Sequence, residues 1–238
     1  YYRHFFDYDQ QRQNASYNRE LVQRLESLLY KSYLEIQRDS ENEQTVQNLK
    51  LIENELDQIV FQENLDPVDY LDQINLTGVT AMEEDLFEAT RSYLGRLQLY
   101  FQNKELEALA LRDSVYEALV RKYGSKERLV ELKNDYTNER LEHIVTNKDQ
   151  VPYMYQYNTQ MIRKKDPIFM KPTSGFGRAH FYAPEKRLGH HSFDTFWFNL
   201  VLIWISTFFF YMTLVFDVLR KLVDRVENIR LRKQTNGP

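Results

Sequence analysis

The sequence of 238 residues contains no cysteine, only 7 glycines and only 6 prolines. The absence of cysteine excludes disulfides, thiolate metal sites and cysteine nucleophiles, although it does not identify the compartment of the protein. The scarcity of glycine and proline favours helices over a turn-rich β architecture. We therefore predict a mainly α chain.

Several functional classes are disfavoured by charge and by missing motifs. The net charge is −4, and no basic stripe lies outside the C-terminal tail, so we expect no nucleic-acid partner. A phosphate-binding loop needs a Gly-Lys pair, and no glycine here precedes a lysine. The run Gly175-Phe176-Gly177-Arg178 is similar to the start of a dinucleotide fingerprint but lacks the third glycine, so we expect a tight bend. No nucleophile–base pair is evident. We expect no catalytic and no cofactor-binding residue in this chain.

Three of the five histidines, His180, His190 and His191, lie close together in the sequence. A zinc site formed by them is one alternative. The i, i+4 spacing of helical zinc ligands is absent, however, so we predict interfacial or hydrogen-bonded histidines and no metal ligand.

The longest apolar run extends from Thr195 to Phe216, and its twenty-two residues carry no charge between Asp194 and Asp217. A helix of that length rises roughly 33 Å, which just covers the hydrocarbon core of a bilayer. The alternative is a helix buried in a soluble core, but no other segment is apolar enough to surround it. We predict a transmembrane helix over residues 195–219, so that membrane lipid is an expected partner.

Upstream of this run, apolar residues recur at three- and four-residue spacing, which predicts amphipathic helices. The first begins near Asn14 and forms an antiparallel hairpin with a second helix over residues 43–60. A short helix follows over 67–78, and then a long helix in which Gly95 or Asn103-Lys104 is a possible break. Gly124-Ser125 reads as the glycine after one helix and the N-cap of the next, which continues to about Ile144.

These patterns divide the chain into five parts. They are a fragment edge or interface segment (1–11), a helical extracytoplasmic domain (12–149), an irregular aromatic, Pro- and Gly-containing connector with possible short strands (150–194), the transmembrane helix (195–219) and a basic cytoplasmic tail (220–238). The expected fold is an extracytoplasmic bundle of helical hairpins, followed by the connector and one C-terminal transmembrane helix. Residues 218–229 are expected to extend this helix as an amphipathic one.

Charge asymmetry predicts the orientation of the apolar helix. Residues 180–194 contain two Lys or Arg residues, whereas residues 220–234 contain six. The C-terminus is therefore expected in the cytoplasm and the helical body outside it.

The apolar helix also has two expected faces. At 100° per residue, Asn199, Ser206, Thr213 and Asp217 fall within about 40° of one another. Because polar side chains avoid lipid, we predict that this face packs against other transmembrane helices. The alternative is that Ser and Thr bond to their own backbone and that the stripe is accidental. The opposite face, predicted to meet lipid, carries four aromatic residues, which are Trp197, Trp204, Phe208 and Tyr211.

Four motifs near the C-terminus carry a resemblance to a known family. They are KKDPIFM (164–170), FGRAHFYAPEKR (176–187), FDTFWFN (193–199) and FDVLRK (216–221). They resemble the C-terminal end of large ABC transporters of Bacteroidota, in which an ATP-binding cassette is fused to a membrane domain like that of the G-subfamily exporters. The resemblance is strongest over residues 150–221, while over 12–147 only the general helical character agrees.

The resemblance implies that this chain is an extracytoplasmic insertion plus the last transmembrane helix of an exporter in a bacterial inner membrane. The body would be periplasmic and the C-terminus cytoplasmic. ATP and Mg²⁺ would then be bound by a cassette outside this chain. The implied partners are other helices of the same transporter and a second copy or a partner half-transporter. The alternative function is a membrane-anchored helical scaffold without an ATPase.

Overall fold

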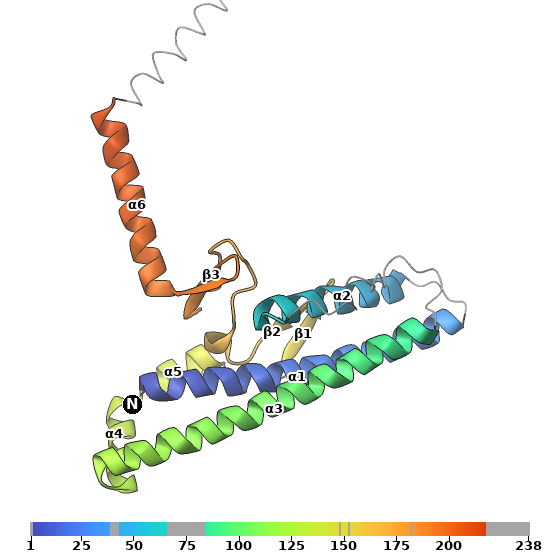
Figure 1. Ribbon diagram of the computed structural model, residues 1–238, viewed down its shortest axis with the longest axis horizontal. Coiled ribbons are helices and arrows are strands. Elements are labelled where there is room, and N and C mark those ends of the chain that lie inside the picture. Colours follow the sequence, from blue (N-terminus) through green and yellow to red (C-terminus); the bar gives the residue numbers. More distant parts are fainter. Residues whose placement is uncertain are drawn as a thin grey trace, which may run out of the picture.

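A computed structural model describes residues 2–38, 43–65, 84–147, 149–151, 153–181 and 183–217. The chain is mainly helical, as predicted, and ends in one apolar helix (Figure 1). The predicted helix over 67–78, the amphipathic extension over 218–229 and the basic tail lie outside the described residues.

Two long helices, α1 (Tyr2–Gln37) and α3 (Glu84–Tyr123), run antiparallel along the length of the helical body. Their buried positions recur every seven residues, the spacing of helices that pack at a shallow angle. On α1 these positions are Tyr8, Ala15, Val22 and Leu29, and on α3 they are Phe87, Leu94, Phe101 and Ala108. The third helix, α2 (Glu43–Glu63), covers one part of this pair.

The main core lies where α1, α2 and α3 meet. Its fully buried members include Leu25 of α1, Ile52 and Leu56 of α2, and Leu94 and Phe101 of α3. The predicted pairing of α1 with α2 is present, but α3 is the more extensive partner of α1. Sequence periodicity identifies the buried face of each helix and not which helix lies against it.

The first helix begins at Tyr2, about three turns before the predicted start at Asn14. Residues 2–11 are therefore part of α1, and their assignment to a fragment edge or interface segment stays a prediction. The physical reason is a second, small core in which Tyr8 packs against Leu119 of α3 and Leu129. This contact stabilises a stretch whose own sequence is mostly polar.

Neither predicted break interrupts α3. Gly95 costs about 1 kcal/mol of helix propensity relative to alanine, which is small beside the burial of its neighbours Leu94 and Leu97. After α3, Gly124 adopts φ 89° and Ser125 caps the next helix by accepting a hydrogen bond from the N–H of Arg128, as predicted.

The helix that follows is shorter than predicted, because the chain is divided into α4 (Lys126–Tyr136) and α5 (Glu139–Thr146). Thr137 and Asn138 between them are extended, and the Asn138 side chain accepts from the N–H of Leu141, so it caps α5. An Asx cap inside a periodic pattern competes with the helix backbone.

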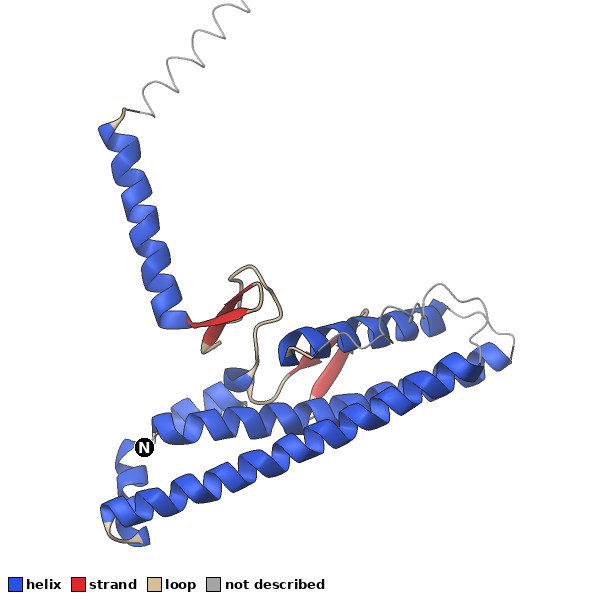
Figure 2. Ribbon diagram, viewed as in Figure 1, coloured by secondary structure: helices blue, strands red, loops and turns tan. Residues whose placement is uncertain are grey.

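The connector is more regular than predicted and contains two antiparallel hairpins (Figure 2). The first is β1 (Met154–Tyr157) with β2 (Gln160–Arg163), and the second is β3 (Glu185–Leu188) with β4 (His191–Asp194). The 3₁₀ turn η1 (Pro167–Phe169) lies between them, and α6 (Thr195–Val215) begins directly after β4.

Candidate functional site at the base of the apolar helix

The apolar helix α6 extends away from the helical body, and none of its residues is buried (Figure 1). The helix has 21 residues, and the mean hydropathy of its 18-residue window is 1.9, so it is long and apolar enough to span a membrane. It is the only helix of this kind within the described ranges. Such an exposed apolar surface needs lipid or another protein to cover it.

The start of α6 is fixed by Asp194, the last residue of β4. Its carboxylate accepts from the N–H groups of Phe196 and Trp197, at 2.8 and 3.4 Å, which satisfies two donors of the first turn. Thr195 bonds to the preceding segment through its N–H to the carbonyl of Pro184 and its hydroxyl to that of Ala183. No linker therefore separates the second hairpin from α6.

Three of the four residues of the predicted packing face have local side-chain partners. Asn199 accepts from the ammonium of Lys186 at 2.8 Å. The hydroxyls of Ser206 and Thr213 donate to the carbonyls of Leu202 and Phe210 in the same helix. Such bonds to the backbone of the helix are what the alternative interpretation of this face expects. Asp217 lies beyond the helix end with φ 48°. Packing against other transmembrane helices stays a prediction.

The predicted lipid-facing aromatics are all exposed on α6, and these are Trp197, Trp204, Phe208 and Tyr211. The neighbouring apolar residues of the helix are exposed as well. Exposure alone therefore does not distinguish the predicted lipid face from the predicted packing face.

A network of buried polar contacts attaches the first hairpin to the helical body. The Glu55 carboxylate of α2 accepts from the N–H of Met161 at 2.6 Å. Burial raises the pKa of Glu55 to about 7, and the bond from Met161 only partly opposes this effect. The Arg163 guanidinium donates to Oδ1 of Asn14 at 2.7 Å, which connects β2 to α1.

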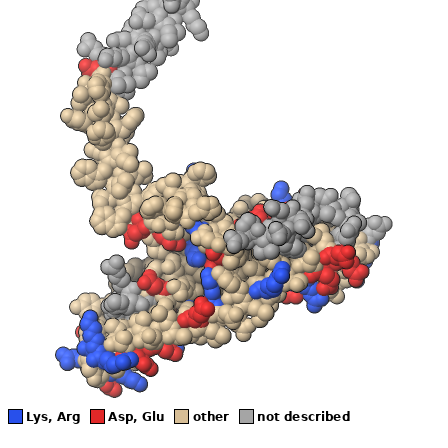
Figure 3. All heavy atoms as spheres, in the orientation of Figure 1, with Lys and Arg blue, Asp and Glu red and all other residues tan. Residues whose placement is uncertain are grey.

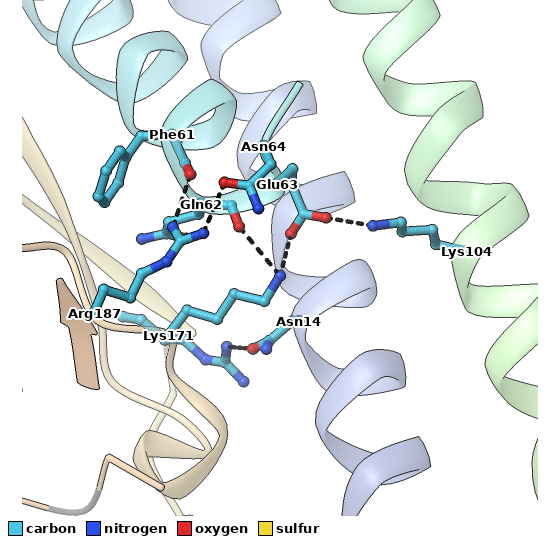
Figure 4. Close-up of polar contacts among 9 residues, drawn as sticks. Asn14, Phe61, Gln62, Glu63, Asn64, Lys104, Lys171 and Arg187 are labelled. Carbon is cyan, nitrogen blue, oxygen red and sulfur yellow. Dashed lines mark hydrogen bonds and ion pairs between the residues drawn. The ribbon is translucent and has the colours of Figure 1, made fainter. Parts of the chain in front are cut away.

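The second attachment is centred on Glu63, the last residue of α2 (Figure 4). Its buried carboxylate accepts from Lys104 of α3 at 2.5 Å and from Lys171 at 2.8 Å. Burial alone would raise the pKa of Glu63, but the two lysines hold it below its ordinary value. One carboxylate thus joins α2, α3 and the segment between the hairpins.

The third attachment is Arg187 of β3, which is 4% exposed. Its guanidinium donates to the carbonyl of Phe61 at 2.7 Å and to Oδ1 of Asn64 at 2.9 Å (Figure 4). Its carbon Cζ lies 4.7 Å from the centre of the Phe61 ring. The carbonyl of Phe61 belongs to the last turn of α2, where carbonyls lack helix partners and the helix dipole favours a cation.

A cleft of about 450 Å³ lies beside these contacts, between α1, the end of α2, α3 and the second hairpin. Three donors at its wall have no partner among the residues that the structure describes: Nε2 of Gln10, Nδ2 of Asn14 and Nε of Arg187. Asn14 is only 7% exposed, and its Oδ1 faces the guanidinium of Arg163, so the NH₂ group is the one left over. The cleft can therefore accommodate waters or another hydrogen-bond acceptor.

The three histidines near the second hairpin differ in their surroundings. His180 bonds through Nε2 to the carbonyl of Pro167 at 2.9 Å, and burial lowers its pKa, while His190 and His191 are exposed. In the part of the chain that the structure describes, no three His, Asp or Glu side chains are grouped to hold a metal ion.

Sequence reasoning missed the residues that attach the hairpins, namely Asn14, Glu55, Glu63, Lys104, Lys171 and Arg187. A charged residue at a helix end or on a short strand is usually solvated, so these positions carried no distinct signal. The one usable sign was Glu55, a carboxylate between Ile52 and Ile59 on the apolar face of α2.

Comparisons with protein-family models, curated proteins and solved structures found no match to this chain.

Proposed function

We propose that the chain is the extracytoplasmic arm and the last transmembrane helix of an ABC-type exporter. The observation that carries this proposal is the joining of α6 to the helical body without a linker, through Asp194, Arg187 and Glu63. A helix that only anchors a protein in the membrane does not need to be attached to the folded body. An arm that moves together with a transmembrane helix needs such an attachment.

In this proposal, α6 lies in a bacterial inner membrane and is one wall of the transporter. Its exposed side chains would meet lipid on one side and other transmembrane helices on the other. A cassette outside this chain would bind ATP and Mg²⁺, and its hydrolysis cycle would tilt α6. Because β4 continues directly into α6, a tilt would be transmitted to the end of α2 and from there to the rest of the arm.

The resemblance of residues 150–221 to the C-terminal end of such exporters supports the proposal, and the structure gives this stretch a physical role. Two of the four motifs contain residues at the base of α6: the second contains Arg187, and the third contains Asp194 and Asn199. Conservation of these positions would preserve the attachment.

The deciding observation is the coding sequence upstream of Tyr1. The proposal expects a cassette with a phosphate-binding loop, followed by several apolar spans. A signal peptide or a start codon just before Tyr1 would reject it.

Orientation provides a second test, made simple by the absence of cysteine. In spheroplasts, a membrane-impermeant maleimide should label Val151→Cys in the body, whereas Lys233→Cys in the tail should react only after permeabilisation. Labelling of the tail in intact spheroplasts would reverse the proposed topology.

A second candidate function is a membrane-anchored helical scaffold without an ATPase. It is favoured by the exposed apolar residues Tyr136, Leu141 and Ile144 at the end of the body formed by α4 and α5. A partner protein would cover them. The upstream sequence distinguishes the two functions, because a scaffold requires no cassette.

A further inference from the structure

Lys186 of β3 reaches from the second hairpin to the first turns of α6. Its ammonium donates to Oδ1 of Asn199 at 2.8 Å and lies 5.1 Å from the centre of the Phe198 ring. Both contacts cross from β3 to α6, and the strand lies beside the base of the helix (Figure 1). Lys186 is therefore a cation that the fold places against the start of the apolar helix.

The Phe198 ring that lies beside this ammonium packs against the loop between the hairpins. Gly177 of that loop has φ 72°, and a Cβ added to it would lie 2.6 Å from Cζ of the ring. The N–H of Gly177 donates to the carbonyl of Arg187, the neighbour of Lys186. The same loop thus contacts the ring and the strand that carries Lys186, which fixes the two relative to each other.

The charge of Lys186 is not neutralised by the part of the chain that the structure describes. Its partners there are a neutral carboxamide and an aromatic ring, and no carboxylate pairs with it. Glu185 and Asp194 are close in the sequence, but they form a cross-strand pair on the opposite face of the hairpin, because strand residues alternate between faces. An ammonium has three N–H donors, so two remain after the bond to Asn199.

The position of this ammonium along α6 follows from Asn199. Helical side chains lean toward the N-terminus of their helix, so the Asn199 amide lies over the first turn of α6. Because the apolar run just covers the hydrocarbon core of a bilayer, the first turn lies where that core meets the headgroups. In Figure 3, α6 is uncharged along its length and charged side chains begin at its base. The ammonium of Lys186 therefore lies at the level of the lipid headgroups.

We propose that Lys186 and Asn199 bind the phosphate of an anionic phospholipid in the leaflet at the start of α6. The remaining N–H donors of Lys186 bond to phosphate oxygens, and the NH₂ group of Asn199, which the contact with Lys186 leaves unused, adds a neutral donor. An anionic lipid is preferred to a zwitterionic one, because it brings no second cation to a site that already carries a positive charge. This inference rests on α6 spanning the membrane, as in the proposed function.

The surface of α6 beyond the site is suited to the acyl chains of such a lipid. Leu202 and Ile203 lie one turn after Asn199 on the same side of the helix, and they are 52% and 62% exposed. The headgroup contact and this apolar surface are therefore continuous. The lipid lies at one end of the face that is predicted to pack against other transmembrane helices, and basic pockets between such helices bind headgroups.

Quenching of tryptophan fluorescence by brominated lipids tests the site, with the full chain in phosphatidylcholine nanodiscs. The sequence contains two tryptophans, and both are in α6. The test variant combines Ile203→Trp with Trp197→Phe and Trp204→Phe, so its reporter lies about 40° around the helix from Asn199. The control variant carries Trp197→Phe alone and keeps Trp204, which lies about 140° from Asn199 at nearly the same depth.

Part of the phosphatidylcholine is replaced by brominated phosphatidylglycerol or, for comparison, by the same fraction of brominated phosphatidylcholine. The proposal expects an about fivefold preference for the anionic lipid at position 203, the factor that one lysine beside an anionic headgroup supplies. Trp204 should report no such preference. Lys186→Met should abolish the preference at position 203. Lys164→Met should retain it, because that lysine lies at a similar distance, 5.2 Å, from the Tyr155 ring but on the first hairpin.

Two further variants test the roles of the two side chains separately. Asn199→Leu keeps the cation but removes the group that positions it, so the preference should decrease, and an unaltered preference contradicts the site as described. Lys186→Arg keeps the charge and should retain the preference. Soluble glycerol phosphate should not reduce the preference beyond the effect of sodium chloride at equal ionic strength. A larger reduction would show that the site takes free phosphate and would overturn the assignment to lipid.

Equal quenching by the two lipids at position 203 overturns the proposal, and so does a preference that survives Lys186→Met. Both results leave the membrane span intact, because brominated phosphatidylcholine still quenches the reporters. If neither brominated lipid quenches either reporter, α6 does not lie in the bilayer. That result refutes the proposed function together with the lipid site.

Discussion

The attachment of α6 to the helical body depends on Arg187, so we expect Arg187→Met to release the second hairpin. The substitution leaves the backbone carbonyl of Phe61 and Oδ1 of Asn64 without the guanidinium donors of Arg187. Hydrogen bonds to a charged group contribute about 1.5–3 kcal/mol each. Part of this gain is offset because the guanidinium no longer has to be desolvated. We expect the docking to weaken by about 3 kcal/mol, which is roughly a hundredfold in the opening equilibrium.

Hydrogen exchange followed by mass spectrometry measures this opening. A two-stranded hairpin is only marginally stable alone, so release from α2 should expose its ladder amides to exchange. In the Arg187→Met variant, amides of residues 185–194 should exchange on the order of a hundredfold faster, the factor given by the opening equilibrium. The β1–β2 hairpin, attached through Glu55, should exchange as in the original protein.

Two substitutions provide the controls. Arg187→Lys keeps the charge but loses the bidentate geometry, so its exchange should be intermediate. Arg178→Met removes a cation from an exposed position of the preceding loop and should change nothing. If exchange over 185–194 is unaltered in Arg187→Met, the hairpin is not held by this residue and the reasoning is wrong.

Three further predictions follow from the structure. Burial raises the pKa of Glu55 in the folded protein to about 7, above its pKa in the unfolded chain. The free energy of unfolding should therefore be largest at a pH below the unfolded pKa, and it should fall by on the order of 3 kcal/mol as the pH rises through 7. Glu55→Gln should remove this dependence in denaturant unfolding at pH 5 and 8, and an unchanged slope would contradict the assignment. Gly177→Ala should destabilise the base of α6 by on the order of 1–3 kcal/mol, and Phe198→Ala should rescue it only partly because the positive φ remains. Leu25→Ala should cost about 2–5 kcal/mol in the same unfolding assay; a cost below 1 kcal/mol would show that the site is not packed as described.

The helices and the apolar span could be predicted from the sequence because each is specified by a local pattern. The buried faces of α2 and α3 follow the three- and four-residue spacing. Gly124 follows the end of α3 and Ser125 caps the start of α4, as predicted. These signals need only neighbouring residues, so no knowledge of the fold is required.

What escaped prediction depends on contacts between distant parts of the chain. The first turns of α1 are stabilised by Tyr8 against Leu129, 121 positions later in the chain. The docking of β3 depends on Arg187 reaching Phe61, 126 positions earlier. A single sequence contains no record of such pairs, and a buried charged residue looks like a solvated one until its partner is known.

The division of residues 126–146 into two helices is a different case. Its signal is local, since Thr137 and Asn138 have low helix propensity and Asn is a preferred N-cap. The apolar spacing of Leu132, Tyr136 and Leu141 continues through the break and conceals it. A residue that commonly caps helices is therefore as informative about a helix boundary as the apolar periodicity, even where that periodicity continues past it.

The central claim is that α6 and the helical body are held together as one unit at the membrane. Spin labels at Leu106→Cys in α3 and Phe208→Cys in α6 test it most directly, by double electron–electron resonance in nanodiscs. Our account predicts one narrow distance distribution, which broadens when Arg187→Met is added. A distribution that is already broad without that substitution would contradict the claim.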